Sequence, residues 1–529
     1  MSARVAGTLA VVLWTAATAV TAWAEGDAAA AAAERGWFGA ARERWRSAAA
    51  GDAAIQIERL DGVEREVRRH AAQCDEAAGL AWSAAGDEWE WVAGQDDEAC
   101  PSVPAVAGRL LVWNDGRSLR GAAIDTGGPP WPMGDADRAT LLFPRGLSGL
   151  PAPDMPGERR PQVMPAPAAA AGRIHAVIPR GGGGWLCCLD LSAAAEGRLM
   201  WRTDAVGLCR AAGGTAPAVE FDGQPVADHE SCLVIVRAGG RRGDLSLVAC
   251  DARDGGLCWI RPLGPAVTAA GLDPARGLRQ AAFAEDRIVV DTHAGSLEAF
   301  DRDGTPAWTT ALPASAAVAG LDGAAQPPML VADRLYVVAP GGGGIVAVEP
   351  RGGGIVWQWQ PAGGGRVALL GGVDGDVVAA VRGGRGPDER SCLVRLAGAD
   401  GRVVARRDVE GWQPAGRGVL AERTIFWPLR RDDVAGGGAD LHVAVLDAAT
   451  LEPRRPPVAV PSAPAGTAAP RQPPSRAPAG GDPAGGEEAV RLVVAAGRLV
   501  VSASGRTACL RAAAGGAAAA GRFAPRPLQ

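Results

Sequence analysis

The sequence contains no lysine, so all 54 basic residues are arginines, and its only asparagine is Asn114. Without lysine the chain cannot form the Gly-Lys-Ser/Thr phosphate loop of nucleotide hydrolases, and it cannot form a lysine Schiff base. The 59 acidic residues outnumber the basic ones and leave a formal charge of -5. Proteins that bind the nucleic-acid backbone carry a basic excess, so we expect no nucleic-acid partner.

Cysteine is also sparse, with 10 residues in a chain of 529. That is too few for a disulfide framework, although single bridges are compatible with an exported protein. Cys250 and Cys258 flank a turn, and Cys74 and Cys100 bracket the entry to the repeat region described next. Either pair could be bridged, and buried free thiols are the alternative.

One long apolar segment is present, from Val5 to Val20 after Arg4. Ala22-Trp23-Ala24 before Glu25 fits small-x-small cleavage, so residues 1–24 are predicted to be a signal peptide that is cut between Ala24 and Glu25. An uncleaved anchor is the alternative, because about 20 apolar residues can span a bilayer. The signal peptide predicts a periplasmic or secreted protein with no membrane span after its removal.

Residues 25–79 are rich in Ala, Glu and Arg, and Ile57, Leu60, Val63 and Val67 recur at helical spacing. This pattern predicts a short α-helical segment. From about residue 80 the sequence pattern changes to short runs of β-branched residues separated by Gly and Asp. This pattern predicts antiparallel strands joined by tight turns.

A sequence segment is repeated within this β region. The segment "DRIVVDTHAGSLEAFDRDGTPAW" begins at residue 286, and "DRLYVVAPGGGGIVAVEPRGGGIVW" follows 47 residues later. Related units start 42 to 47 residues apart at the closest and bring the total to eight over residues 80–515. This period is typical of four-stranded propeller blades, so we predict an all-β propeller of eight blades, with seven as the alternative.

The order of apolar strand, Gly turn, "xAxD", second turn and closing Trp resembles the repeat of pyrroloquinoline quinone-type β-propellers. This superfamily includes the quinoprotein alcohol dehydrogenases and the propeller lipoprotein of the outer-membrane β-barrel assembly machinery. The resemblance implies that each closing Trp packs between adjacent blades. The residues in question are Trp131, Trp201, Trp259, Trp308 and Trp357. Ala405 stands where the sixth unit should have Trp, so we expect looser docking there.

The last unit lacks a closing strand, and residues 516–529 are predicted to be a disordered tail. The segment "DEWEWV" before the first unit is an unassigned strand with Trp89 and Trp91. We expect it to supply the outer strand of the last blade and so to close the ring. Two Pro-rich inserts are predicted at 127–171 and 453–487, the second of them disordered.

The enzymatic alternative is an alcohol or sugar dehydrogenase that holds pyrroloquinoline quinone and calcium, as the resemblance allows. Cys187-Cys188 matches the adjacent cysteines of those enzymes. The pair lies in a predicted strand, however, where its side chains should point to opposite sheet faces. The calcium site of those enzymes uses Asn and acidic ligands, whereas this chain contains a single Asn. It also contains no Cys-x-x-Cys-His motif that could bind a haem. The five His residues are scattered without metal-ligand spacing.

No catalytic, cofactor-binding or metal-ligating residue is therefore assigned from the sequence. The resemblance favours a non-catalytic scaffold that binds a protein partner at the cell envelope, and this function rests on fold-level analogy.

Overall fold

The computed structural model of the chain describes residues 88–94, 104–108, 110–114, 119–124, 141–143, 165–178, 183–191, 197–214, 219–239, 243–265, 279–292, 295–313, 326–383, 390–431, 441–460, 490–495, 498–503 and 506–511. The chain divides into two compact units, Met1–Ala77 with Phe283–Arg287 and Ala78–Ala282 with Ile288–Gln529. Apart from Phe283–Arg287, all described residues belong to the second unit. The predicted helical segment, the signal cleavage site Ala24/Glu25 and the C-terminal tail lie outside the described residues.

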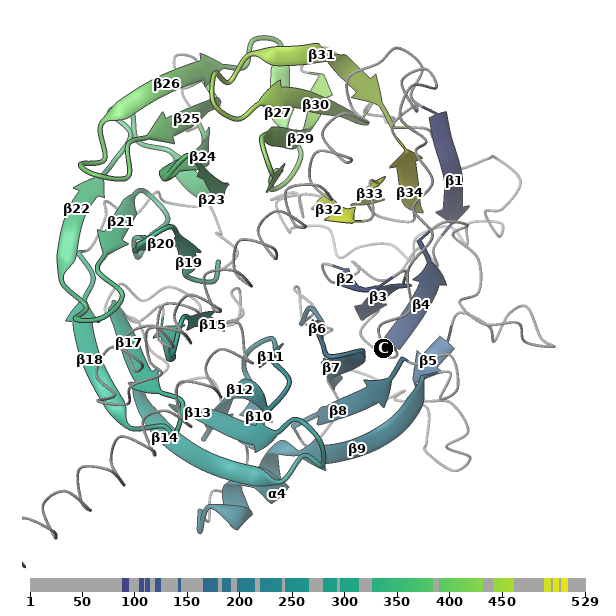
Figure 1. Cartoon of the computed structure of the whole chain (residues 1–529), viewed down its shortest axis with the longest axis vertical. Coiled ribbons are helices and arrows are strands. Elements are labelled where there is room, and N and C mark those ends of the chain that lie inside the picture. The colour runs from purple at the N-terminus through teal and green to yellow at the C-terminus, as the bar shows by residue number, and fades with distance from the viewer. Residues whose placement is uncertain are drawn as a thin grey trace, which may run out of the picture. The chain divides into compact units, whose positions relative to one another are not determined.

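The protein is an all-β propeller of eight antiparallel blades (Figure 1). The predicted fold class is thus confirmed with the larger of the two blade counts. Among the described residues the one helix is α4 (Ala205–Ala211), which follows the second blade. No helix in this part of the chain has the length and hydrophobicity that a membrane crossing requires.

The blades, numbered along the chain, have the following strands. Blade 1 contains β2 (Ala105–Ala107), β3 (Leu110–Asn114), β4 (Leu119–Ala123) and β5 (Leu141–Phe143), and blade 2 contains β6 (Ala168–Ala170), β7 (Arg173–Ile178), β8 (Trp185–Asp190) and β9 (Arg198–Asp204). Blade 3 contains β10 (Val219–Phe221), β11 (Val226–Ala227), β12 (Ser231–Ala238), β13 (Asp244–Asp251) and β14 (Leu257–Pro265). Blade 4 contains β15 (Gln280–Ala284), β16 (Arg287–Asp291), β17 (Ser296–Asp301) and β18 (Pro306–Ala311), and blade 5 contains β19 (Met329–Val331), β20 (Arg334–Val338), β21 (Ile345–Val348) and β22 (Ile355–Trp359).

Blade 6 contains β23 (Arg366–Val373), β24 (Asp376–Arg382), β25 (Cys392–Leu396) and β26 (Val403–Asp408). Blade 7 contains β27 (Trp412–Pro414), β28 (Val419–Ala421), β29 (Thr424–Arg431), β30 (Leu441–Asp447) and β31 (Pro453–Ala459). Blade 8 combines β32 (Arg491–Ala495), β33 (Arg498–Ala503) and β34 (Arg506–Arg511) with β1 (Glu88–Gly94).

The ring is closed by β1, the segment expected to do so. It pairs antiparallel with β34, so the outermost strand of the last blade comes from the N-terminal side of the first blade. Trp89 lies opposite Leu510 and Trp91 opposite Cys509, with one extra residue between them on β1. Closure by main-chain hydrogen bonds removes the open sheet edge that a linear array of blades would leave.

The predicted Pro-rich inserts are smaller than expected. The first seven residues of the 453–487 insert form β31, the outer strand of blade 7, so the expectation of disorder is wrong there. Proline is tolerated at this place because an outermost strand needs no hydrogen-bond donor on its open side. Two strands, β5 and β6, likewise fall inside the 127–171 insert.

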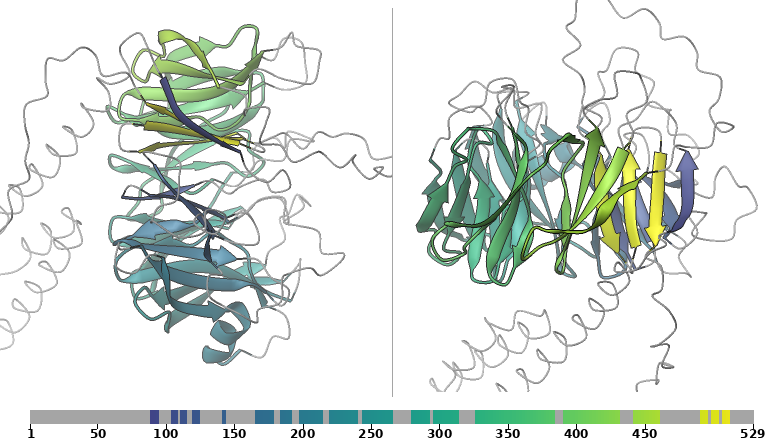
Figure 2. Two further views of the ribbon diagram at one scale, coloured as in Figure 1. Left: turned by 90° about the vertical axis from the view of Figure 1, so that its right-hand side faces the viewer. Right: turned by 90° about the horizontal axis from the view of Figure 1, so that it is seen from above.

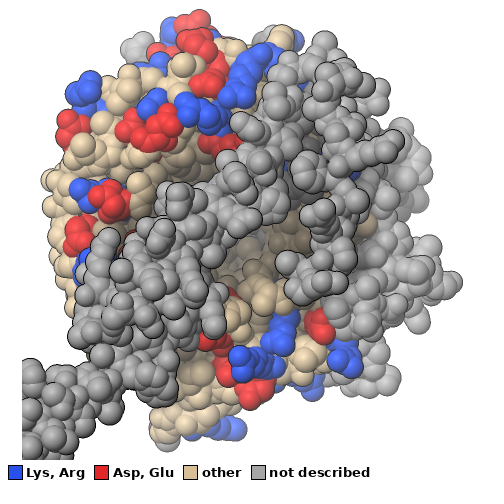
Figure 3. Space-filling model, viewed as in Figure 1, with Lys and Arg blue, Asp and Glu red and all other residues tan. Residues whose placement is uncertain are grey.

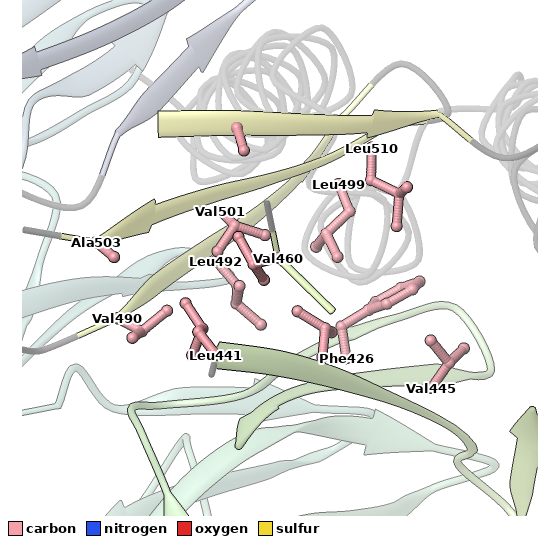
Figure 4. Close-up of a cluster of buried hydrophobic side chains, with 12 residues drawn as sticks. Phe426, Leu441, Val445, Val460, Val490, Leu492, Leu499, Val501, Ala503 and Leu510 are labelled. Atoms are coloured by element: carbon pink, nitrogen blue, oxygen red, sulfur yellow. The ribbon is translucent and has the colours of Figure 1, made fainter. Parts of the chain in front are cut away.

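The core lies between blades rather than within them, in contacts that we call seams. Figure 4 shows one of them, where Phe426, Leu441 and Val445 of blade 7 point toward side chains of blade 8. The blade 8 side chains in this cluster include Leu492, Leu499, Val501 and Leu510. The two side views of the ring show the sheets standing side by side (Figure 2). Each blade therefore buries both faces only with the help of its neighbours.

Candidate functional site

Four of the five predicted docking tryptophans share one arrangement at successive seams. Each indole N–H donates to a main-chain oxygen in the outer turn of the next blade, at donor–acceptor distances of 2.9 to 3.1 Å. The pairs are Trp201 with Ala252, Trp259 with Arg302, Trp308 with Pro350 and Trp357 with Gly398. These tryptophans hold neighbouring blades together, so the Trp surplus has a structural use.

The ring of each docking Trp also covers a glycine of the same turn. Gly353 has φ +74°, and a Cβ added there would lie 2.6 Å from the ring of Trp308. The same steric relation links Gly255 with Trp201, Gly304 with Trp259, and Gly401 with Trp357. Glycine is therefore required both by the left-handed backbone and by the ring above it.

Trp131 and Trp91 are the remaining tryptophans with a predicted role in docking or ring closure. Trp131 lies outside the described residues, and the outer strand of blade 1 is β5 instead. Trp91 lies opposite Cys509 in β34, and Trp201 lies opposite the corresponding Cys188 in β8. Each of these tryptophans directly follows the extra residue on its own strand, so by register Trp91 has the docking position of blade 8.

Blade 6 has a different filling at its docking position. Ala405 lies opposite Arg395, as Trp357 lies opposite Ala347 in blade 5. The turn position that is Gly401 in blade 6 is Leu451 in blade 7, which has φ +60° and is fully buried. Leu451 packs in one cluster with Ala405, and Arg395 donates to the main-chain oxygen of Ala449 at 2.7 Å. The seam is filled from the opposite side, and the described contacts do not support the looser docking expected there.

The adjacent cysteines do not form the arrangement that the dehydrogenase alternative needs. Cys187 packs in the core between blades 1 and 2, whereas Cys188 packs in the core between blades 2 and 3. Both are fully buried and free. Their side chains thus point to opposite sheet faces, and a disulfide between neighbours is not accommodated.

The buried thiols are also unreactive. Burial raises the pKa of Cys188 to about 12, so the thiol stays protonated at neutral pH. His175 Nε2 lies 3.9 Å from Cys188 Sγ, and burial lowers the pKa of His175 to about 4. A neutral imidazole beside a neutral thiol is not an activated nucleophile pair. Cys250 and Cys258, one of the two possible disulfide pairs, are free.

Asn114 is fully engaged in the structure. Its side-chain nitrogen donates to the main-chain oxygens of Val177 at 2.7 Å and Pro165 at 3.4 Å, across the seam between blades 1 and 2. The residue is completely buried and serves the packing of two blades. Asn114 is therefore not available as a calcium ligand in this structure. In the described ranges, no group of three or more His, Cys, Asp or Glu side chains is placed to hold a metal ion.

Sequence reasoning missed a buried charge cluster at the seam between blades 3 and 4. Arg279 forms an ion pair with Asp222, and its Nε donates to the main-chain oxygen of Thr292 at 2.9 Å. Arg237 binds Glu220 at 2.7 Å and lies 3.7 Å from Asp222. Burial raises the pKa of Asp222, while Arg279 and Arg237 lower it. The carboxylates and guanidinium groups satisfy one another, so this cluster stabilises the seam.

One protein family and several solved structures are similar to this chain. The sequence profile of the family described as outer membrane protein assembly factor BamB matches residues 123–343 and 243–416. BamB from Moraxella catarrhalis is 13% identical with a TM-score of 0.46, covering 80% of this chain and 100% of that one. Quinohemoprotein alcohol dehydrogenase from Comamonas testosteroni is 12% identical with a TM-score of 0.47, covering 85% and 79%. No curated protein matches the chain.

Proposed function

Because the chain belongs to the family of the outer membrane protein assembly factor BamB, we propose that it is an exported, non-catalytic platform that binds a protein partner at the cell envelope. Export is supported by the N-terminal sequence, with its apolar stretch and small-x-small site. The observation that carries the binding role lies on the rim of the ring.

Two neighbouring blades expose apolar residues on their outermost strands. Ile355 and Val356 on β22 are 43% and 40% exposed, and Val403 and Val404 on β26 are 40% and 45% exposed. In the part of the chain that the structure describes, these four and Met200 are the large exposed hydrophobic side chains. Figure 1 shows β22 and β26 next to each other on the rim. Exposed apolar side chains on two neighbouring outer strands are typical of an interaction site.

The same two strands are also open to strand addition. Both end their sheets, so the outer N–H and C=O groups of each face away from the blade. The outer strands of blades 3, 4 and 7 each contain proline, which blocks pairing, whereas β22 and β26 contain none. The occupant that fits is an extended segment of the partner protein with apolar side chains, added as a further strand.

Photo-crosslinking in isolated cell envelopes tests this function. A photoreactive residue at Val356 or at Val404 should capture the same protein partner. The matched control is Thr309 on β18, which is also exposed but follows Pro306, and it should capture none. Val356→Pro should abolish capture from position 404 if one strand spans both edges, or leave it if each edge binds separately. Equal capture from all three positions would contradict the proposed docking surface, and recovery of the native protein from the cytoplasm would contradict the envelope location.

A further inference from the structure

Three thiols lie together in the core between blades 2 and 3, in contrast to the charged side chains of both signs that Figure 3 shows on the surface of the ring. They belong to Cys188 on β8, Cys232 on β12 and Cys250 on β13, and each of these residues is completely buried. The proposed function uses none of them. Because a disulfide needs a specific backbone separation, the strand register decides which two thiols are placed to be joined.

Cys232 and Cys250 lie directly opposite each other on neighbouring antiparallel strands. Two residues away on each strand, the Ala252 N–H donates to the Glu230 oxygen at 2.8 Å, and hydrogen-bonded pairs recur at every second position of such a ladder. The cysteines therefore form a hydrogen-bonded pair, in which the Cα atoms are about 5.5 Å apart. This separation is typical of disulfides, which span about 4.4 to 6.8 Å, and both side chains point into the same core.

The other cysteines near Cys250 are less well placed to pair with it. Cys258 is the extra residue where the register between β13 and β14 shifts, and Cys250 lies opposite Leu257 instead. Cys258 is also exposed, whereas Cys250 is buried in the core. Cys188 belongs to blade 2 and meets this sheet only across the seam. The register thus selects Cys232 as the partner of Cys250, in place of Cys258, which the sequence had suggested.

We propose that Cys232 and Cys250 are a disulfide modification site, oxidised while the chain folds after export. The proposal rests on the exported location given in the proposed function, because a cytoplasm keeps thiols reduced. Both residues are free thiols in the structure, which is the reduced form. The oxidant is the disulfide of a small thiol or of an exchange protein. One cysteine thiolate displaces a thiol from this donor, and the other cysteine then displaces the donor's second thiol, so two electrons and two protons pass to the donor.

Folding closes the two sulfurs to further exchange. Burial raises the pKa of Cys250 to about 12 and raises that of Cys232 well above its usual value, so little thiolate exists in the folded ring. Exchange therefore has to precede the packing of β12 and β13 against blade 2. Once formed, the bond fixes the pairing of these two strands and restricts the unfolded chain, which stabilises the fold.

Refolding of the full mature chain from urea, with oxidised and reduced glutathione as the exchange donor, tests the pairing. Cleavage at arginine after alkylation of the remaining thiols places the two cysteines in separate peptides, 211–237 and 243–253, each with a single cysteine. Mass spectrometry should find these peptides joined, and reduction should separate them. Unjoined peptides would overturn the proposal. So would a bond from either of them to 181–198 or 254–261, which contain Cys188 and Cys258.

Two variants accompany the peptide map of the wild type. Cys392→Ala is the matched control, since Cys392 is a buried cysteine that lies opposite Asp408 in blade 6, and it should leave the joined peptides unchanged. Cys232→Ala should leave Cys250 alkylated and should abolish the higher thermal unfolding midpoint that the oxidised wild type has over its reduced form. Cys250 bonded to another peptide in this variant at the wild-type yield would overturn the pairing. The wild-type map decides the question if Cys232→Ala does not fold.

The same map of the native protein, with thiols alkylated at harvest, separates this proposal from the proposed function. Joined peptides in protein from the cell envelope support both. Envelope protein with free thiols at positions 232 and 250 would overturn the disulfide and leave the proposed function standing. Recovery of the native protein from the cytoplasm would contradict the proposed function, whereas the refolding result would still decide the pairing.

Discussion

At the seam between blades 6 and 7, the turn residue Leu451 is large and the docking residue Ala405 is small. Mutation can restore the opposite arrangement, with a large docking residue and a small turn residue. The docking position and the turn position hold Trp and Gly at four seams, but Ala and Leu between blades 6 and 7. Leu451 corresponds to the glycines by its main-chain bond, since its N–H donates to Asp447 as that of Gly401 does to Ala397. We predict that Ala405→Trp and Leu451→Gly each destabilise the ring, and that the double variant loses less stability than the sum of the two single losses.

The expected magnitudes follow from the packing. Leu451→Gly empties a completely buried site and should cost about 2 to 5 kcal/mol, partly offset because glycine relieves the left-handed backbone at φ +60°. Ala405→Trp forces a large ring against Leu451 and should cost about 1 to 3 kcal/mol or more. Additive behaviour would give the double variant a loss of roughly 3 to 8 kcal/mol. A restored Trp–Gly contact should instead keep the loss below about 2 kcal/mol, a coupling of at least ~1 kcal/mol.

Urea unfolding of the four proteins of this double-mutant cycle, followed by circular dichroism, measures the free energies of unfolding. Arg406→Gln, on the exposed side of β26 and paired with Asp408 of the same strand, serves as a control for unrelated changes in this strand and should shift stability by less than about 0.5 kcal/mol. Additive losses in the double variant would refute the reasoning, because they would show that residues 405 and 451 do not compensate for each other's size across the seam.

Three other predictions concern single residues. Asn114→Leu should lower the free energy of unfolding by about 1 to 3 kcal/mol, because it leaves buried main-chain oxygens without their donor; retention of wild-type stability would show that these bonds contribute nothing. The folded-state pKa of His175, about 4, lies below its usual 6.5, so the unfolded chain binds more protons; stability should be complete above pH 6.5 and fall by roughly 3 kcal/mol toward pH 4. His175→Leu should flatten that pH profile, and an unchanged profile would assign it to other groups. Trp91→Ala should lower the thermal unfolding midpoint more than Trp89→Ala, since Trp91 holds the docking register, and the reverse order would count against ring closure through Trp91.

Much of the fold was predictable because a propeller repeats one local pattern. The spacing of β-branched runs and Gly turns recurs along the chain, with a closing Trp in blades 2 to 5, so the blade count and the use of Trp201 or Trp308 follow from the sequence. The closing strand was predictable for a related reason. The last repeat is one strand short, and the segment around Trp91 has no partner of its own.

The charged seams could not be predicted in the same way. Asp222 and Arg279 are 57 residues apart and meet only because a split inner strand bridges to the next blade. A second bridge of this kind brings Arg417 beside Arg491. The local sequence feature that marks each bridge is a single glycine, Gly223 or Gly416. The strand β31 was missed because its prolines are typical of disorder, yet an outermost strand tolerates them.

The central claim, a binding platform without a redox cofactor, is tested most directly by calorimetric titration of the chain from Glu25 onward with pyrroloquinoline quinone in the presence of calcium. With Cys187 and Cys188 on opposite sheet faces and Asn114 bound to main-chain oxygens, the account predicts no detectable heat of specific binding at several temperatures. Stoichiometric binding at micromolar or lower concentrations would contradict it and would point to an alcohol or sugar dehydrogenase.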